Sequence, residues 1–501
     1  MKKLFYSIIG CLVISTLQAQ DITDALRFSQ DNLNGTARFR AMGGAFGALG
    51  GDLSALNVNP AGSAVFNNNQ VAFTLTNYGV KNNSDYFGLK TSANDNNTTL
   101  NQGGGVFVFY NKNETSNWRK FSLSFNYDNT NNYNSSFFSA GTNPTNSVDK
   151  YFLYYADGVP LNLLENEYYD NLDSGSQQAF LGYHSYLINP VVNTLDNTNY
   201  VSNVPAGGNY YQENEVYTKG SNGKFTFNLA TQYADFLYLG MNLNLHTIDY
   251  RRSSSFYEDN ANALGSDYQV TNVRFDNELY TYGSGFSFQL GAIAKVTNAI
   301  RLGLAYESNT WYTINDELTQ RIAAVSSNNV ETLLPDVVDP MYPNKFVPYK
   351  LQTPSKWTGS FAYVFGRSGL ISVDYALKNY GYAKFKPEND PYFYGQNIYV
   401  IRNELKTNEE LRIGGEYRIK QLSLRGGYRF EGSPYKSGQG VGGLKGYSGG
   451  LGFNFGSTKL DVSYSYSERD SQVAAFSQGF TDYANVNTKF NNVSVTVLFE
   501  L

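Results

Sequence analysis

The sequence predicts an all-β protein: a transmembrane antiparallel β-barrel of about 14 strands with an N-terminal plug, or hatch, inside its lumen. Aromatic residues make up 16% of the chain, although hydrophobic residues reach only 41%. Apolar and polar residues alternate from about residue 69 to the end, and the connections alternate between short and long. A membrane barrel produces all three patterns, because each strand faces lipid on one side and a polar lumen on the other.

The N-terminus resembles a secretion signal. Lys2 and Lys3 precede an apolar stretch from Leu4 to Leu17, which is too short to span a membrane as a helix. We expect cleavage after Ala19. The chain is therefore divided into a signal peptide (1–19), a plug (20–68) and an outer-membrane barrel with long extracellular loops (69–501).

The cysteine content excludes disulfides from the mature protein. Cys11 is the only cysteine, and the apolar stretch continues past it, which disfavours a lipoprotein anchor. After cleavage no thiol remains for a disulfide or a thiolate metal site. The net charge of -5, with 38 basic and 43 acidic residues, disfavours nucleic-acid binding.

Fourteen segments carry the period of two that is typical of strands. They lie near residues 69–80, 102–112, 118–136, 222–234, 236–252, 272–296, 298–314, 354–366, 369–382, 397–420, 421–431, 446–456, 459–470 and 490–501.

The connections predict the topology. Bacterial barrels have short turns on the periplasmic side and long loops outside. Short turns are expected near 113–117, 234–235, 297–298, 367–368, 420–421 and 456–457. Long loops are expected at 81–101, 137–221, 253–271, 315–353, 383–396, 432–445 and 471–489.

The last strand predicts which residues face lipid. Val493, Val495, Val497, Phe499 and Leu501 form its apolar face. The same rule turns a set of charged side chains on neighbouring strands into the lumen: Asp374, Arg412, Glu416, Arg418, Arg425, Arg429 and Asp461. We favour ion pairs that fill the barrel and hold the plug, over a site for a ligand headgroup.

Residues 20–68 do not alternate and are rich in small residues. Their glycines permit close packing and positive φ angles, at Gly43, Gly44, Gly47, Gly50 and Gly51. No strand precedes this run and no Lys-Ser/Thr pair follows it, which disfavours a phosphate-binding loop.

This segment resembles the hatch of the FadL/TodX outer-membrane transporters. The similarity runs from Gly35 to Gly62 and includes the tripeptide Asn59-Pro60-Ala61, which matches the hatch motif of that family. Further similarity lies in the strands that contain Trp357, Asp374 and the run 411–417. The Asn- and Tyr-rich composition resembles that of Bacteroidetes outer-membrane proteins.

The resemblance implies a 14-stranded, plugged barrel that takes up small hydrophobic molecules, such as long-chain fatty acids or aromatic hydrocarbons. It also implies that the ligand leaves through a gap in the wall, and the polar run 129–136 in the third strand suits a kink there. We expect a monomer that contacts outer-membrane lipid and a small hydrophobic ligand. Without a nucleotide site, flow is expected to be passive.

The loop 137–221 contains an aromatic cluster. Its members are candidates for a ligand entrance: Phe137, Phe138, Tyr151, Phe152, Tyr154 and Tyr155. Apolar side chains on an exposed loop either form such a groove or pack the loop on itself, and the sequence leaves both readings open.

Other chemistries have weaker support. His184 and His246 lack metal-ligand spacing, so we expect no metal and no cofactor, and give haem ligation little weight. No nucleophile elbow is present, and an enzyme is not expected. The rival function is an interaction protein: a FadL-like shuttle of the type IX secretion system that binds secreted proteins through its long loops.

Overall fold

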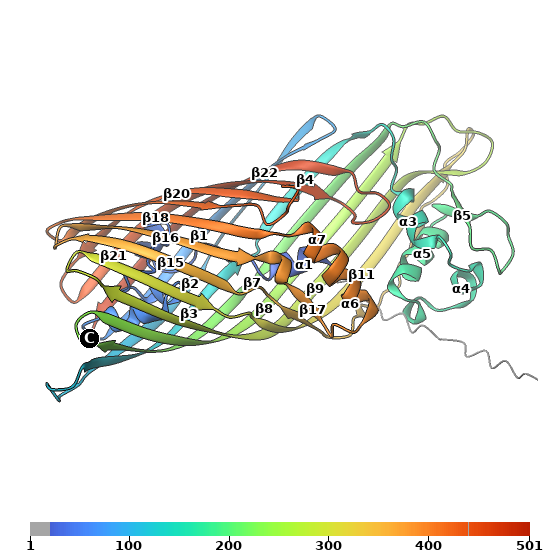
Figure 1. Ribbon diagram of the computed structural model, residues 1–501. Coiled ribbons are helices and arrows are strands. Elements are labelled where there is room, and N and C mark those ends of the chain that lie inside the picture. Colours follow the sequence, from blue (N-terminus) through green and yellow to red (C-terminus); the bar gives the residue numbers. More distant parts are fainter. Residues whose placement is uncertain (1–20, 439) are drawn as a thin grey trace, which may run out of the picture.

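The computed structural model describes residues 21–438 and 440–501, which form a long closed barrel of tilted strands (Figure 1). Within these residues the wall is an antiparallel sheet of 14 strands, as the sequence predicts. The expected signal peptide 1–19 and Cys11 lie outside the described residues. No helix among the described residues has both the length and the apolar character to cross a bilayer.

Some wall strands consist of two or more pieces. In chain order the pieces are β1 (Gln70–Tyr86), β2 (Leu89–Tyr110), β3 (Trp118–Asn132), β4 (Ser135–Asn143), β7 (Tyr210–Tyr233), β8 (Leu237–Asn260), β9 (Gln269–Lys295), β10 (Ile300–Glu307), β11 (Trp311–Ser327), β12 (Asp336–Val338), β13 (Asn344–Lys345), β14 (Tyr349–Gln352), β15 (Lys356–Phe365), β16 (Gly369–Asn379), β17 (Lys384–Lys386), β18 (Thr407–Ile419), β19 (Leu422–Glu431), β20 (Val441–Asn454), β21 (Thr458–Ala474) and β22 (Tyr483–Glu500).

The first and last strands close the barrel. β1 pairs with β22 from Gln70 opposite Glu500 to Asp85 opposite Asn485. On β22, Val493 is 43% exposed on the outer surface, whereas Thr496 is 1% exposed and points inward. The predicted facing of this strand is therefore confirmed, and no free edge remains between the two ends of the sheet.

The predicted short turns are confirmed, but the first predicted long loop, 81–101, is wrong. β1 and β2 instead continue as a hairpin, with Phe87 and Gly88 at its tip, both at positive φ (48° and 85°). The Asn- and Thr-rich composition of this stretch is poor for a strand by propensity. Cross-strand pairing and a two-residue turn of the hairpin type outweigh that propensity.

Three predicted strands are interrupted or partly helical. The segment 118–136 breaks at residues 133–134, and 298–314 breaks at 308–310, so each belongs to a wall strand made of separate pieces. The start of 397–420 is helical: η5 (Gln396–Ile401) and α7 (Arg402–Glu404) precede β18. Short apolar runs such as Ile398–Ile401 satisfy either period, and here packing onto neighbouring elements selects the helix.

Strands also extend into other predicted long loops. β8 continues to Asn260, β9 begins at Gln269, and β11 continues to Ser327. On β8 the outward-facing residues are apolar up to Leu245. From Thr247 to Ser255 the outward-facing residues are polar. The barrel therefore rises past its lipid-facing belt at the end that carries the long connections.

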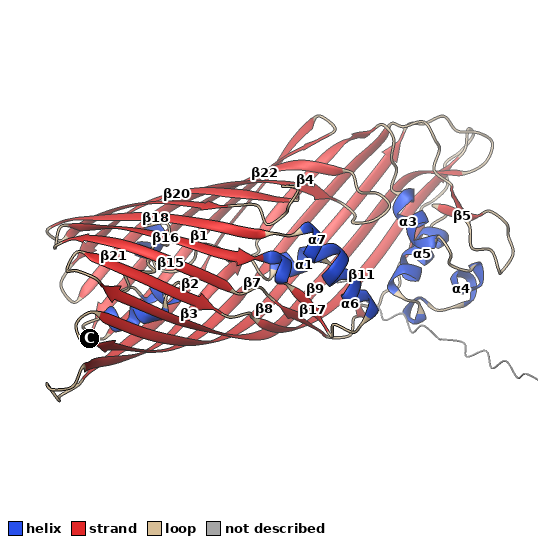
Figure 2. Ribbon diagram, viewed as in Figure 1, coloured by secondary structure: helices blue, strands red, loops and turns tan. Residues whose placement is uncertain are grey.

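The segment before the barrel folds into short helices inside the lumen (Figure 2). These are α1 (Ile22–Arg27), α2 (Ala37–Ala41), η1 (Leu53–Asn57) and η2 (Pro60–Val65). Each begins at a side chain that accepts a backbone N–H: Asp21, Thr36, Asp52 and Asn59. We call residues 21–68 the plug from here on. α1 packs against the helices η4 (Tyr380–Tyr382), α6 (Pro391–Gly395) and η5 near the long-loop end.

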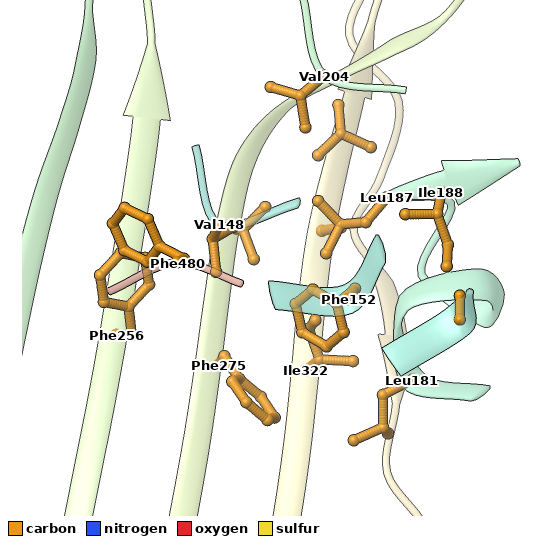
Figure 3. Close-up of a cluster of buried hydrophobic side chains, with 14 of the residues drawn as sticks. Val148, Phe152, Leu181, Leu187, Ile188, Val204, Phe256, Phe275, Ile322 and Phe480 are labelled. Carbon is orange, nitrogen blue, oxygen red and sulfur yellow. The ribbon is translucent and has the colours of Figure 1, made fainter. Parts of the chain in front are cut away.

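Residues 144–208 fold into a separate loop module at the barrel mouth (Figure 1). Its elements are α3 (Asp149–Ala156), α4 (Leu161–Asn166), η3 (Tyr169–Asn171), α5 (Ser174–His184), β5 (Ile188–Pro190) and β6 (Tyr200–Ser202). Figure 3 shows its core, in which Phe152, Leu181 and Leu187 face Phe275 and Ile322 of the wall. Burial of these apolar side chains fixes the module to the tall part of the barrel.

Candidate functional site

The Asn-Pro-Ala tripeptide joins the plug to the wall. Asn59 accepts from the backbone N–H of Ala61 (3.1 Å) through Oδ1, which starts η2. Its Nδ2 donates to the carbonyls of Gly47 (2.7 Å) and Ala292 on β9 (3.0 Å). Pro60 needs no hydrogen-bond acceptor for its nitrogen at this helix start. One amide side chain thus connects two parts of the plug to a wall strand.

Wall glycines make this contact close enough. Gly240 on β8 and Gly291 on β9 stand opposite each other in the sheet, under the tripeptide. A Cβ at Gly291 would lie 2.0 Å from Asn59 Oδ1, and one at Gly240 would lie 2.5 Å from the Ala61 nitrogen. The sequence analysis missed this site. Its signal was present, because both glycines occupy lumen-facing positions of strongly alternating strands.

The plug glycines have two roles. Gly43, Gly44, Gly50 and Gly51 take positive φ angles between 60° and 80°, a region that favours glycine. Gly47 instead passes close to the wall, since a Cβ there would lie 2.0 Å from Ser360 Oγ. Each predicted glycine therefore lies at a turn or a close approach of the plug.

Asp374 is the lumen carboxylate that binds the plug at Phe46 and Gly47. Its Oδ2 accepts from the backbone N–H of Phe46 (2.9 Å) and of Gly47 (3.0 Å). Asp374 is buried on β16. Bonds from two successive backbone N–H groups to one carboxylate are charge-assisted, so they are stronger than bonds between neutral groups.

The other six predicted lumen charges take part in two chains of ion pairs. In the first, Glu416 bonds Arg38 of α2 (2.8 Å) and Arg425 (2.7 Å), and Arg425 reaches Asp461 (2.5 Å). Arg418 also pairs with Glu416 (2.6 Å), but its side chain is 47% exposed. Arg38, which the sequence analysis did not select, connects this chain to the plug.

The second chain contains Arg412 and Arg429, which share Glu410; Arg429 Nε lies 3.1 Å from Glu410 Oε1. Glu431 then pairs with both Arg429 and Arg469. The sequence analysis did not select Glu410, Glu431 or Arg469. Simple alternation from Arg412 and Arg429 places the two glutamates on the lumen side of their strands.

A cavity of about 70 Å³ lies between the plug and the wall. Its apolar part is formed by Leu33 of the plug with Val80, Leu444 and Phe490 of the wall. Polar side chains complete the lining: Asn32, Asn34, Tyr78, Asn132, Asn134, Arg429, Ser448, Ser465, Ser467 and Asn492. A concave space that combines apolar side chains with convergent polar groups is the usual form of a small-molecule site.

The wall is incomplete on one side of the barrel. β2 pairs with β3 only from Gln102–Asp128 to Tyr110–Lys120, although β2 continues to Leu89. Beyond this point β4 pairs with β7 alone in the sheet. The pairing of β3 with β7 has a register shift between Asn129 and Asn131, directly after the point where β3 leaves β2. This shift lies within the polar run that is expected to carry a kink.

Side chains bridge the seam where the ladder is missing. Asn82 Nδ2 donates to the carbonyl of Ser136 (2.6 Å), and Asn132 Nδ2 donates to Asn97 Oδ1 (2.8 Å). Ser136 Oγ donates to the carbonyl of Asn94 (3.0 Å). Such single contacts are more easily exchanged than a continuous ladder, so this seam is expected to open more readily than the paired parts of the wall.

The predicted aromatic candidates do not form one groove. Phe137 is buried in the wall beside Tyr86 and Val216, and Phe138 lies next to it on β4. Phe152 is buried in the core of the loop module (Figure 3). Tyr151 packs against Phe476, with 4.5 Å between the two ring centroids. Tyr155 is half-buried, and Tyr154 is exposed. The structure therefore gives at least two of the six candidates, Phe137 and Phe152, a packing role.

The two histidines lie apart. His184 Nε2 donates to the carbonyl of Leu164 (2.7 Å) within the loop module, and His246 contacts Ser287 Oγ (2.9 Å) in the wall. Among residues 21–438 and 440–501, no three His, Cys, Asp or Glu side chains gather as a metal site.

Solved structures share this architecture. A Pseudomonas aeruginosa FadL homologue matches 94% of this chain over 99% of its own length, with a TM-score of 0.54 and 11% identity. The toluene transporter TodX of Pseudomonas putida matches 94% of this chain over its full length, with a TM-score of 0.52 and 14% identity. At such identities the similarity establishes the fold.

In sequence, residues 277–499 match the family described as outer membrane protein transport protein (OMPP1/FadL/TodX). This part of the chain is thus similar in sequence to the OMPP1/FadL/TodX family. Residues 6–123 also match the family described as uncharacterised protein family UPF0164. No curated protein sequence is significantly similar. Proteins of the FadL/TodX family are outer-membrane β-barrels of Gram-negative bacteria.

Proposed function

We propose that this FadL/TodX-family barrel lets small hydrophobic molecules cross the outer membrane passively, as a monomer. The observation that carries the proposal is the cavity between plug and wall, with its apolar side chains Leu33, Val80, Leu444 and Phe490. An apolar solute that covers these four side chains gains about 25 cal/mol per Å² of buried surface.

The seam between β2 and β4 supports the same proposal. Val80 of the cavity lies on β1, two residues from Asn82, which bridges the seam. Asn132 and Asn134, at the β3–β4 break, also line the cavity. We propose that the ligand passes from the cavity to the membrane through this seam.

Uptake by cells tests the proposal. Cells that express the protein are expected to accumulate radiolabelled long-chain fatty acid or toluene faster than cells with an empty vector. A matched variant, Leu444→Asp, places a charge in the cavity without touching the plug contacts, and is expected to slow uptake. Equal accumulation with and without the protein, for both probes, would contradict the proposal.

A second candidate is a binding protein for secreted proteins, as in the type IX shuttle. Large apolar side chains are exposed at the long-loop end: Tyr168 is 77% exposed, and Met341 and Tyr342 are 78% exposed. Residues 144–208 carry seven acidic residues and one lysine. Such a surface favours a basic partner with apolar side chains. Co-purification of secreted proteins, lost on Tyr168→Ser plus Tyr342→Ser, would support this candidate against the first.

A further inference from the structure

A second cleft, separate from the cavity beside the plug, opens at the long-loop end of the barrel. It has a volume of about 500 Å³ and lies between the loop module and the connection 328–348. Its lining comes from η3, from α5 and from residues between Pro340 and Lys345. Ordinary small-molecule sites have volumes of about 300–1,000 Å³, so this cleft has the size of a ligand site.

A chain of hydrogen bonds joins the two sides of the cleft. Asn344 Nδ2 donates to Gln177 Oε1 (2.6 Å), and Gln177 Nε2 donates to the carbonyl of Tyr169 (3.1 Å). The hydroxyl of Tyr169 in turn donates to Gln320 Oε1 on β11 (3.1 Å). Gln177 is 1% exposed, so these bonds are sheltered from water. The cleft is therefore shaped before a ligand arrives, which lowers the entropic cost of binding.

Two exposed tyrosine rings line the cleft from opposite segments. Tyr168 directly precedes η3, and Tyr342 belongs to the connection 328–348; they are 77% and 78% exposed. Within residues 21–438 and 440–501, neither ring packs on another aromatic ring. The face of such a ring carries partial negative charge and offers a flat apolar surface. Both rings are thus available to stack on C–H groups of a ligand.

The rest of the lining is polar and mixed in its hydrogen-bonding character. The carboxylate of Asp170 only accepts, the ammonium of Lys345 only donates, and the amides of Asn171 and Asn344 do both. The two charges have opposite signs, and Lys345 Nζ already lies 3.6 Å from Glu317 Oε1. Such a lining selects neither an anion nor a cation. It suits hydroxyl groups, because each hydroxyl both donates and accepts.

We propose that this cleft binds a neutral sugar unit of a glycan outside the cell. A pyranose ring has C–H faces that match Tyr168 and Tyr342, and its edge carries the hydroxyl groups that the polar lining can bond. A purely apolar molecule fits less well, because it would remove water from Asp170 and the amides without replacing their hydrogen bonds. The inference goes beyond the proposed function, since the cleft shares no residue with the cavity or the seam.

An array of neutral and acidic oligosaccharides tests the proposal on the purified full-length protein in non-ionic detergent. The protein is expected to bind at least one neutral glycan, with the same affinity at low and high salt, because no charge pairing is involved. Tyr168→Ala and Tyr342→Ala are each expected to weaken this binding by about tenfold, since each removes one stacking surface. Both side chains are exposed, so neither change should disturb folding.

Tyr186→Ala is the matched control, because Tyr186 belongs to the same module, is 53% exposed and does not line the cleft. It is expected to leave glycan binding unchanged. The array also carries purified lipopolysaccharide. Binding there that Tyr168→Ala weakens would assign the sugar to a membrane lipid, whereas binding to oligosaccharides alone would assign it to a soluble glycan.

Three results would overturn the sugar site. These are no binding of any neutral glycan by the folded protein, binding that is lost at high salt, and equal weakening by Tyr186→Ala and the two cleft variants. If Tyr168→Ser plus Tyr342→Ser loses secreted proteins while no glycan binds, the two rings serve a protein partner and the sugar site is wrong. Uptake of hydrophobic molecules is measured separately, so either proposal can fail while the other stands.

Discussion

At the residue scale, the direction in which a wall side chain faces decides whether a charge is tolerated there. Val497 lies on the lipid side of β22 and Thr496 on the lumen side, where Thr496 Oγ1 accepts from the backbone N–H of Ala37 (2.7 Å). An arginine on the lipid face costs about 2–4 kcal/mol at mid-membrane. Val497→Arg is therefore expected to lower the folded fraction in outer membranes more than Thr496→Arg. Equal folding, or a worse Thr496→Arg, would reverse the assigned facing.

A second residue-scale prediction concerns the glycine beneath the plug. In Gly291→Ala the new Cβ meets Asn59 Oδ1 and Pro60 Cδ, so the Asn59 contacts to the wall must shift. We expect a higher ion conductance in planar bilayers, because the plug is then held less firmly. Gly359→Ala is the matched control, since nothing lies within 4 Å of its Cβ. Equal conductance of the two variants would contradict the role given to Gly291.

At the scale of elements, some aromatic residues of the loop module are expected to stabilise its fold and others to capture ligand. Phe152→Ser removes a fully buried aromatic ring, and comparable truncations cost about 3–5 kcal/mol. It is expected to make residues 144–208 sensitive to protease. Tyr154→Ser with Tyr155→Ser is expected to keep the module folded and to weaken capture of the hydrophobic ligand. If uptake is unchanged in the double tyrosine variant, Tyr154 and Tyr155 only pack the module and do not capture ligand.

The same module is expected to respond to pH through Asp149. Burial raises the pKa of this carboxyl above its ordinary value near 3.8, against hydrogen bonds from Ser202 and Ser147 that lower it. A raised pKa means that folding favours the protonated form, so this contribution to stability is full below about pH 4 and is lost as pH rises through the raised value. Amide exchange of α3, corrected for intrinsic rates, should show less protection at pH 8 than at pH 5.

Asp149→Asn is expected to reduce this difference, and Asp157→Asn, at an exposed position, to preserve it. A difference that persists unchanged in Asp149→Asn would assign the response to another group, such as the buried Glu258, which accepts from the backbone N–H of Val148 (2.9 Å).

The elements also show how far sequence reasoning reaches. A period of two located every wall strand, since lipid and lumen impose it along the whole barrel. It did not locate the hairpin at 81–101 or the helices at 396–404, because there the pairing partners and packing decide. The Asn59 tripeptide was predictable from its resemblance. The glycines beneath it, and the ion pair of the wall residue Lys378 with the plug residue Asp31, depend on which strand passes beside which part of the plug.

At the scale of the whole molecule, the central claim is that residues 21–62 close an otherwise open barrel. The plug buries Arg40, Phe46 and Leu56 inside the lumen and bonds to the wall through Asn59, Arg38 and Asp31. The wall closes independently of it, through the pairing of β1 with β22. Removal of the plug should therefore leave a folded, water-filled barrel.

Conductance of single proteins in planar bilayers is the most direct test. The full chain is expected to pass almost no current, and the chain without residues 21–62, still heat-modifiable on gels, is expected to conduct ions steadily. Asn59→Ala should fall between the two, with brief openings, because it loses the contacts to Gly47 and Ala292 but retains Arg38 and Asp31. A folded deletion that conducts no more than the full chain would contradict the account.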